Sequence, residues 1–197
     1  GLQFASSTVG GNLHATATTG NMTQSGALDI EGTTTLITSA DDATITLGTT
    51  SNAFTGALLI TTNDSGTDTA GDVSVHGGTT ALVIGDSTVD GDLTLTSTAT
   101  GAAAIADTGR LNIRGITTVS ASGVNVTLNT TTNNFQGAVK IGGVNVTVVD
   151  AGAIDLGAST VTGTYTLTAG GAVTDSGALA ITGVTTVSAG GDVTLNT

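Results

Sequence analysis

The chain has 197 residues with 30 glycines and no proline, cysteine or tryptophan, and 15 acidic residues against three basic ones give it a formal net charge of −12. A surface this acidic repels phosphate backbones and anionic headgroups, so neither nucleic-acid binding nor membrane insertion is expected. The absence of cysteine excludes disulfides and thiol chemistry, and no apolar run approaches the roughly 18 residues that cross a bilayer.

Short runs in which apolar and polar residues alternate follow one another along the chain, and each predicts a strand with one buried face. Examples lie at 28–30, 45–47, 111–113 and 144–148. Thr, Val and Ile are frequent in these runs, and branching at Cβ suits a pleated surface. Gly, Asn, Asp and Ser separate the runs and indicate turns. An all-β fold is therefore predicted, with a core of Val, Leu, Ile and Ala, because only 2% of the residues are aromatic.

The sequence repeats itself. "STV" begins at Ser7, Ser87 and Ser159, and related phrases follow each time: "GALDIEGTTTL", "GRLNIRGITTV" and "GALAITGVTTV", then "ATITLGT", "VNVTLNT" and "DVTLNT". We interpret residues 1–197 as one continuous segment with internal repeats at about 7–86, 87–158 and 159–197, the last one truncated. We expect this segment to be a piece of a longer protein.

The residue after each "TL" is Gly48, Asn129 or Asn196. This predicts a left-handed backbone at that site, because Gly and Asn tolerate positive φ. Phe54 and Phe135 also occupy one place in two repeats. They are predicted to be large fillers or end plugs of a core that is otherwise made of small residues.

A repeat of 72 to 80 residues fits either a small β-sandwich domain or several turns of a β-solenoid. The lack of proline, the lack of an aromatic core and the likeness of phrases within one repeat favour the solenoid. With rungs of roughly 20 residues spaced about 4.8 Å apart, the chain is expected to form about ten rungs and a rod about 50 Å long.

The phrases "SGALAITGVTTVSAGGDVTLNT" and "NNFQGAVKIGGVNVTVVDAGAIDLGASTVTGTYTLTAGGAVTDSGAL" resemble the repeat regions of very large bacterial surface proteins of the filamentous-haemagglutinin-like class. The likeness covers essentially the whole chain and lies in a repetitive style rather than in a catalytic motif. It implies a right-handed parallel β-helix, export by a type V two-partner or related route, and a role outside the cell as an adhesin, biofilm component or stalk. The Asn-Pro-Asn secretion motif of that class is absent, since the chain has no proline.

Polysaccharide-active enzymes with a β-helix fold use clustered carboxylates with Arg or Lys on one outer face. The three basic residues here, Arg110, Arg114 and Lys140, do not recur between repeats. We interpret them as residues for solubility or local pairing, and we predict no enzymatic activity. His14 and His76 lie far apart in the sequence and lack the spacing of metal ligands, so a zinc site is not expected.

Calcium is the one cofactor with any support, because acidic secreted repeat proteins often bind it through oxygen ligands. The weak candidates lie in "NDSGTDTAGD" and "DGD" and are Asp64, Asp68, Asp72, Asp90 and Asp92. They form no EF-hand or Gly-Gly-x-Gly-x-Asp repeat, so ordinary acidic loops are the alternative. Five Asn-x-Ser/Thr sequences are possible glycosylation sites: Asn21, Asn63, Asn125, Asn129 and Asn145.

The leading hypothesis is a structural, non-catalytic rod segment of a giant extracellular bacterial adhesin or surface filament. Its expected partners are neighbouring repeats, further copies joined end to end or laterally, and host or surface glycans. One alternative is a Thr-rich face that binds ice or a polysaccharide, and the other is a polysaccharide-active enzyme. Thr-x-Thr pairs begin at Thr16, Thr44, Thr94 and Thr164, but their uneven spacing is expected to keep them out of a single column.

Overall fold

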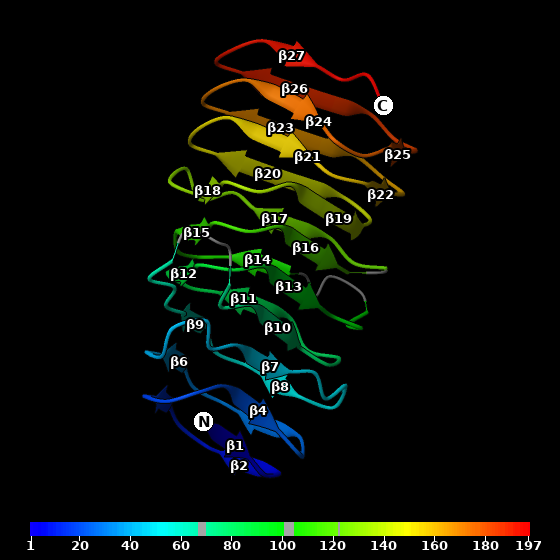
Figure 1. Cartoon of the computed structure of the whole chain (residues 1–197). Coiled ribbons are helices and arrows are strands. Elements are labelled where there is room, and N and C mark those ends of the chain that lie inside the picture. Colours follow the sequence, from blue (N-terminus) through cyan, green and yellow to red (C-terminus); the bar gives the residue numbers. More distant parts are fainter. Residues whose placement is uncertain (67–69, 101–104, 122) are drawn as a thin grey trace.

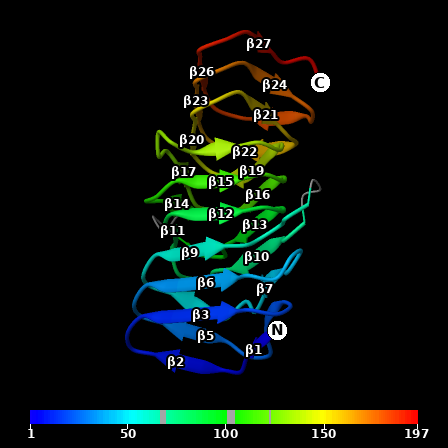
Figure 2. The ribbon, with the colours of Figure 1, turned by 60° about the vertical axis from the view of Figure 1, so that its left-hand side comes forward.

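The chain folds into a parallel β-solenoid of about nine turns. The computed structural model describes residues 1–66, 70–100, 105–121 and 123–197, and within these ranges the regular structure is strand alone. The rungs stack in one column with the two termini at opposite ends (Figures 1 and 2). None of the described residues belongs to a helix that could span a membrane. The prediction of an all-β solenoid is confirmed.

Two sheets of 12 strands each run along the column, and a sheet of three strands lies beside them at the amino-terminal end. The first sheet contains β1 (Leu2–Phe4), β4 (Met22–Gln24), β7 (Ile45–Leu47), β10 (Val73–His76), β13 (Leu93–Thr96), β16 (Thr117–Ser120), β19 (Val139–Gly143), β21 (Ile154–Leu156), β24 (Val173–Asp175) and β27 (Val193–Thr194), with β22 (Ser159–Val161) and β25 (Leu179–Ile181) at its side. The second sheet contains β3 (Leu13–Ala17), β6 (Thr34–Thr38), β9 (Leu58–Thr61), β11 (Leu82–Ile84), β14 (Ile105–Asp107), β17 (Val126–Leu128), β20 (Val146–Asp150), β23 (Tyr165–Ala169) and β26 (Thr185–Ala189), with β12 (Ser87–Val89), β15 (Leu111–Ile113) and β18 (Asn134–Phe135) at its side. The small sheet contains β2 (Ser7–Val9), β5 (Leu28–Ile30) and β8 (Ala53–Phe54).

The rung length varies along the stack. Leu2 pairs with Met22, 20 positions later, whereas Ile45 pairs with Val73, 28 positions later, and Val139 pairs with Leu156 after only 17. The paired strands are nevertheless all parallel, so the difference in length falls between strands rather than within them. The expected rung of roughly 20 residues is therefore close to the observed values.

Every second residue of a strand points into the solenoid, and these residues form one continuous apolar core. Phe54 stacks on Ile30, and Phe135 stacks on Ile113, both almost fully buried at 1% exposure. Their strands β8 and β18 are the last members of the short columns β2–β5–β8 and β12–β15–β18. Both phenylalanines thus fill the core where a short column ends, which confirms their prediction as end plugs.

Equivalent strands of successive repeats lie in different sheets. The strands β1, β4 and β7 belong to the first sheet, their equivalents β11, β14 and β17 to the second, and β21, β24 and β27 again to the first. The long strands β3, β6 and β9 show the opposite alternation with β13, β16 and β19. Three consecutive strands make one rung, and one repeat contains three such rungs plus one further strand, β10 or β20. Each repeat therefore covers about three and a half turns. At the boundary between two repeats, equivalent strands therefore pass from one large sheet to the other.

At each exchange one long strand pairs with two successive short strands. The first residue of β9, Leu58, pairs with Ile84 of β11, and its last residue, Thr61, pairs with Thr88 of β12. Between these two pairs the N–H of Ile60 donates to the hydroxyl of Ser87 at 3.0 Å. The serine of "STV" therefore completes the hydrogen-bond ladder where the strand changes partner.

Corner side chains join one rung to the next. Carboxylate or carboxamide oxygens accept the backbone N–H of a residue one rung later, as Asn12 does from Thr33 and Asp92 does from Ile116. The same arrangement corrects the prediction of a left-handed backbone after "TL". Gly48, Asn129 and Asn196 are not among the described residues with positive φ. At Asn129 the N–H donates to the Asp107 carboxylate at 2.8 Å, so a side chain from the rung below makes this corner without positive φ.

Candidate functional site

The outward faces of the two large sheets carry rows of hydroxyl groups. In the second sheet Thr127, Thr147, Thr166 and Thr186 lie one above another on β17, β20, β23 and β26. Next to the last two, Thr168 pairs with Ser188. Four successive rungs therefore present hydroxyl groups at the rung spacing of about 4.8 Å.

A second column lies on the first sheet. Thr46, Ser74, Thr94 and Thr118 follow one another on β7, β10, β13 and β16, and Lys140 continues the column on β19. Thr46 and Thr94 share this column, two rungs apart with Ser74 between them, whereas Thr16 and Thr166 lie on the second sheet. The four Thr-x-Thr pairs therefore do not form a single column, as expected. The corners absorb the differences in rung length, so unequal sequence spacing still gives strands in register.

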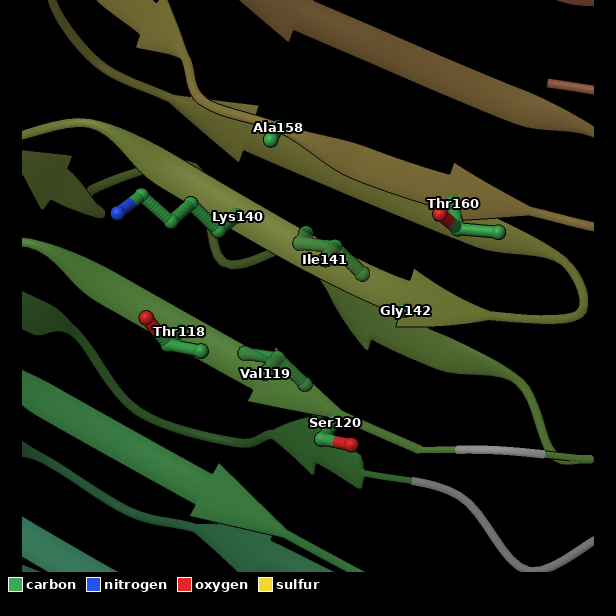
Figure 3. A pocket seen from close by; sticks show the side chains of 8 residues that line it. All are labelled: Thr118, Val119, Ser120, Lys140, Ile141, Gly142, Ala158 and Thr160. Atoms are coloured by element: carbon green, nitrogen blue, oxygen red, sulfur yellow. The ribbon is translucent and has the colours of Figure 1, made fainter. Parts of the chain in front are cut away.

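A notch interrupts the next outward column of the first sheet, in which Thr96, Ser120, Gly142 and Thr160 follow one another. A side chain at Gly142 would meet only the carbonyl oxygen of Val119, 3.9 Å from its Cβ. Two adjoining hollows of about 300 and 360 Å³ share the residues around this position. Figure 3 shows Ser120 and Thr160 on either side of Gly142.

Lys140 lies in the same hollow (Figure 3). Its side chain passes over Gly157, where an added Cβ would overlap the Cγ of Lys140. The equivalent Leu59 covers Gly85 in the same way in the first repeat. The stem of Lys140 thus packs like an apolar side chain while the ammonium group reaches solvent.

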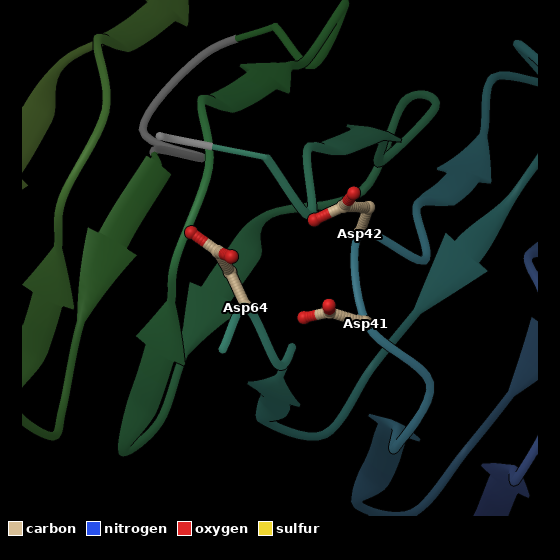
Figure 4. A group of neighbouring side chains, drawn as sticks. All are labelled: Asp41, Asp42 and Asp64. Carbon is tan, nitrogen blue, oxygen red and sulfur yellow. The ribbon is translucent and has the colours of Figure 1, made fainter. Parts of the chain in front are cut away.

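Three carboxylates converge at one corner. The side-chain oxygens of Asp41, Asp42 and Asp64 lie within 4.8 Å of one another (Figure 4). Asp41 accepts the N–H of Ser65 at 2.6 Å, and hydrogen bonds from the backbone and side chain of Ser65 lower the pKa of its carboxyl. Asp64 is a predicted calcium candidate, whereas Asp41 and Asp42 are not. Sequence reasoning missed them because they come from a different rung.

The remaining calcium candidates have separate surroundings. Asp72 accepts the N–H of Asp92 at 2.8 Å, and Asp92 accepts that of Ile116 at 2.7 Å, so both hold corners together. Asp90 accepts the N–H of Asp64 at 3.2 Å. Asp68 lies outside the described residues. The structure thus brings Asp64 next to Asp90 but does not collect the four described candidates into one site.

Arginine 114 is paired with this acidic corner. Its Nη1 atom lies 3.1 Å from Oδ2 of Asp64, whose side chain has no exposed surface, and 3.9 Å from Oδ1 of Asp90. This confirms the interpretation of Arg114 as a residue for local pairing. Calcium takes six to eight oxygen ligands, and a guanidinium beside Asp64 weakens the attraction for a cation. Calcium binding at the corner stays a prediction, which a shift of the melting temperature on calcium titration tests.

The histidines lie apart from these groups. His14 is exposed on β3, and the Nδ1 atom of His76 on β10 accepts the N–H of Gly78 at 3.0 Å. Three sequon asparagines act as corner acceptors: Asn21 for Thr44, Asn125 for Asn145, and Asn145 for Thr164. A sugar at these asparagines would be attached to Nδ2 and would leave the accepting Oδ1 atoms in place. Asn129 is exposed, and Asn63 donates to the carbonyl of Ser39 at 3.4 Å.

The comparisons with known proteins concern the repeats alone. A family model described as "Repeats of unknown function (DUF5649)" matches residues 1–61, 70–142 and 143–197. The second and third matches begin near the starts of β10 and β20. No curated protein and no solved structure matches the chain.

Proposed function

We propose that this chain, which belongs to the family described as "Repeats of unknown function (DUF5649)", serves as a stiff, non-catalytic rod segment of a large bacterial surface protein. The observation that carries this proposal is the unbroken parallel pairing of both large sheets from one end of the chain to the other. In a solenoid each rung contacts only its neighbours, so the length of the rod grows with the number of repeats.

The corners support the same proposal. Side chains such as Asp92, Asn125 and Asn145 tie each rung to the next with hydrogen bonds. Bending the rod away from such an edge stretches these bonds together with the backbone ladder. The likeness of the repeats to filamentous-haemagglutinin-like proteins supports an adhesin or filament at the cell surface as the setting of the rod.

The rod proposal predicts how size changes with repeat number. Variants in which residues 87–158 are present once, twice or three times add about three and a half rungs per copy, or about 17 Å. Small-angle scattering should show the maximum dimension rising by this step while the cross-section stays constant. Growth of the cross-section with each added copy would contradict the proposal.

The surface setting has its own test. Antibodies raised against residues 1–197 should label intact cells of the source bacterium, and brief protease treatment of those cells should remove the label. Labelling that appears only after the cells are opened would contradict an extracellular location while leaving the rod architecture intact.

End-to-end association belongs to the same proposal. The last rungs leave Val184, Val193 and Leu195 exposed by 69%, 50% and 43%, and a solenoid edge also presents unpaired backbone groups. Another rung or another copy stacked there covers both. Sedimentation should detect association of the chain that Val193→Lys weakens, because a charge then enters the contact. An exposed Thr166→Lys variant is the control.

The threonine columns favour a second candidate, a face that binds ice or a polysaccharide. Thr127, Thr147, Thr166 and Thr186 form a regular row of hydroxyl groups across four rungs. An assay of ice recrystallisation and a glycan array test the two ligands. Thr147→Lys with Thr166→Lys should abolish either activity, whereas Thr46→Lys on the other large sheet should not.

A further inference from the structure

A patch of polar side chains lies over the short column β12–β15–β18, which Figure 1 shows in three successive rungs. We define the Arg110 patch as Arg110, Asn112, Asn134 and Gln136. Three donors converge on one acceptor in this patch. The Oδ1 atom of Asn112 lies 3.3 Å from Nη2 of Arg110, 2.8 Å from Nδ2 of Asn134 and 3.5 Å from Nε2 of Gln136.

These bonds arrange the patch but leave much of it open to a ligand. Asn134 and Gln136 use their NH₂ groups, so their carbonyl oxygens remain as acceptors. Arg110 uses one nitrogen of a guanidinium that has five N–H donors in a fixed fork. Arg110 and Gln136 are exposed, and the two asparagines are half-buried.

The first repeat lacks this patch, although its core is the same. The equivalents of the four residues are Ala27, Asp29, Ala53 and Thr55, while the buried Phe54 matches Phe135. Neither the core nor the backbone register therefore requires Arg110, Asn112, Asn134 and Gln136. Four outward differences that gather on one surface indicate that this repeat has acquired a local function.

Arg110 also differs from Arg114 in its charge partners. Among the described residues its guanidinium forms no ion pair, whereas Arg114 is paired with Asp64. The carboxylate of Asp86 lies close by, where its Oδ1 accepts the backbone N–H of Arg110 at 2.7 Å, but it forms no ion pair with the guanidinium. The guanidinium of Arg110 is therefore exposed and outside any described ion pair, and its unused N–H groups can donate to an anionic group.

Hollows flank Arg110 along the axis of the solenoid. One, of about 490 Å³, is lined by Arg110, Thr132, Asn134, Ala151 and Gly152. The other, of about 280 Å³, is lined by Thr61, Asp86, Ser87, Thr88 and Arg110. The larger hollow lies where the short column ends at β18 and the turn after β20 takes its place.

We propose that the Arg110 patch binds an oligosaccharide of uncharged sugars that carries one carboxylate-bearing sugar. The guanidinium of Arg110 pairs with the carboxylate. The carboxamides of Asn112, Asn134 and Gln136 exchange hydrogen bonds with sugar hydroxyls, which like them are both donors and acceptors. This binding goes beyond the role as a rod and does not depend on it.

The chemistry of the patch selects this ligand class. A polyanion is disfavoured, because one arginine faces the field of a strongly acidic chain. A peptide segment needs apolar pockets or a free strand edge. Outward Thr61, Thr88, Asn112 and Asn134 instead supply one polar side chain per rung. At β18, the last strand of the column, the carbonyl of Asn133 and the N–H of Phe135 are already bonded to Ala151 and Asp150. A chain of hydroxylated sugars laid along the axis meets one such side chain at each rung.

The test is an NMR titration in which a saccharide is added to the complete isotope-labelled chain. The probe is an aldotetraouronic acid, in which one glucuronic acid is joined to xylotriose, and xylotetraose is the neutral control of the same size. We expect shifts at Arg110, Asn112, Asn134 and Gln136, and binding at least about tenfold weaker for xylotetraose, because a charge-assisted pair is lost. Binding should also weaken in high salt.

Variants locate the site. Arg110→Gln should weaken binding at least about tenfold with an unchanged melting temperature, whereas Lys140→Gln, which removes a cation from the other large sheet, should leave it unchanged. Three results would overturn the proposal: equal affinity for the two saccharides, equal affinity of Arg110→Gln and the wild type, or no NMR shift at a probe concentration of about 10 mM. That concentration corresponds to roughly the weakest affinity that the titration can detect. An acidic peptide that binds the same residues more tightly would overturn the assignment to a saccharide.

Discussion

The hydroxyl of Ser159 accepts the backbone N–H of Ile141 at 3.0 Å and donates to the carbonyl oxygen of Gly157 at 3.0 Å. Ser87 makes the same two bonds, with Ile60 and Gly85, one repeat earlier. Both serines are almost fully buried, each with 5% exposure. At each boundary a serine side chain thus takes the place of a strand neighbour, and this allows one long strand to pair with two short ones.

Ser159→Ala should destabilise the protein by about 1–3 kcal/mol, because the buried N–H of Ile141 loses its acceptor. Urea unfolding measures the change. Ser7→Ala is the matched control: Ser7 donates to the carbonyl of Ala5 at 3.0 Å in the same motif but is only half-buried. Equal losses for the two variants would show that the serine matters only for its own turn.

Gly137→Ala should destabilise the protein by about 1–3 kcal/mol through overpacking. A Cβ at this position would overlap the carbonyl of Gly115 one rung below and lie 2.9 Å from the backbone nitrogen of Ile116. Gly142→Ala, in the open notch, should change stability by less than about 0.5 kcal/mol. A thermal melt that ranks the two variants in the opposite order would contradict the close approach of the rungs.

Thr117→Val should stabilise the protein by about 1 kcal/mol. The Oγ1 atom of Thr117 is buried without a hydrogen-bond partner, as is that of Thr34 at the equivalent place in the first repeat. Valine keeps nearly the same shape and removes the unpaired hydroxyl. Thr185 is the exposed equivalent in the third repeat, so Thr185→Val should leave the unfolding free energy unchanged. A loss of stability in Thr117→Val would contradict the unpaired hydroxyl.

Asp150 should make the stability of the protein depend on pH. Burial raises the pKa of its carboxyl above the ordinary 3.8, although the N–H groups of Phe135 and Gly152 oppose this by bonding to the charged form. The folded state therefore binds the proton more tightly than the unfolded state. The contribution of this group is fully present below about pH 4 and is lost as pH rises through the folded pKa.

The matched variant is Asp150→Asn, which cannot titrate. The free energy of unfolding of the wild type minus that of Asp150→Asn should fall as pH rises from about 4. Urea unfolding at a series of pH values measures this difference, in which the pH dependence of the other carboxyls cancels. A difference that is constant or that rises with pH would contradict the effect of burial.

Local patterns in the sequence predict the local structure of this chain well. Alternation such as that of Leu111 and Ile113 identifies the buried face of a strand, because the side-chain period of a strand is independent of its partners. Phe54 and Phe135 recur at one place in two repeats, and both are buried at the end of a short column. These inferences need only neighbouring residues or a comparison between repeats.

Features that depend on which rung lies below were missed. Asn129 suggested a left-handed turn, but its N–H is held by Asp107, 22 positions earlier. Asp64 meets Asp41 and Asp42 across rungs of unequal length. The Arg110 patch could have been found by comparing outward residues between repeats. Arg110 and Asn134 in the second repeat are Ala27 and Ala53 in the first.

The exchange of the two large sheets at each boundary sets the distance at which a surface pattern returns. The first and third repeats place equivalent strands in the same sheet, and the second places them in the other. Along an array, a feature shared by all repeats points alternately to opposite sides, and it returns to one side only after two repeats, or about 34 Å. A flat receptor or membrane beside the rod therefore meets every second repeat, and neighbouring repeats are free to diverge in the ligands that they present.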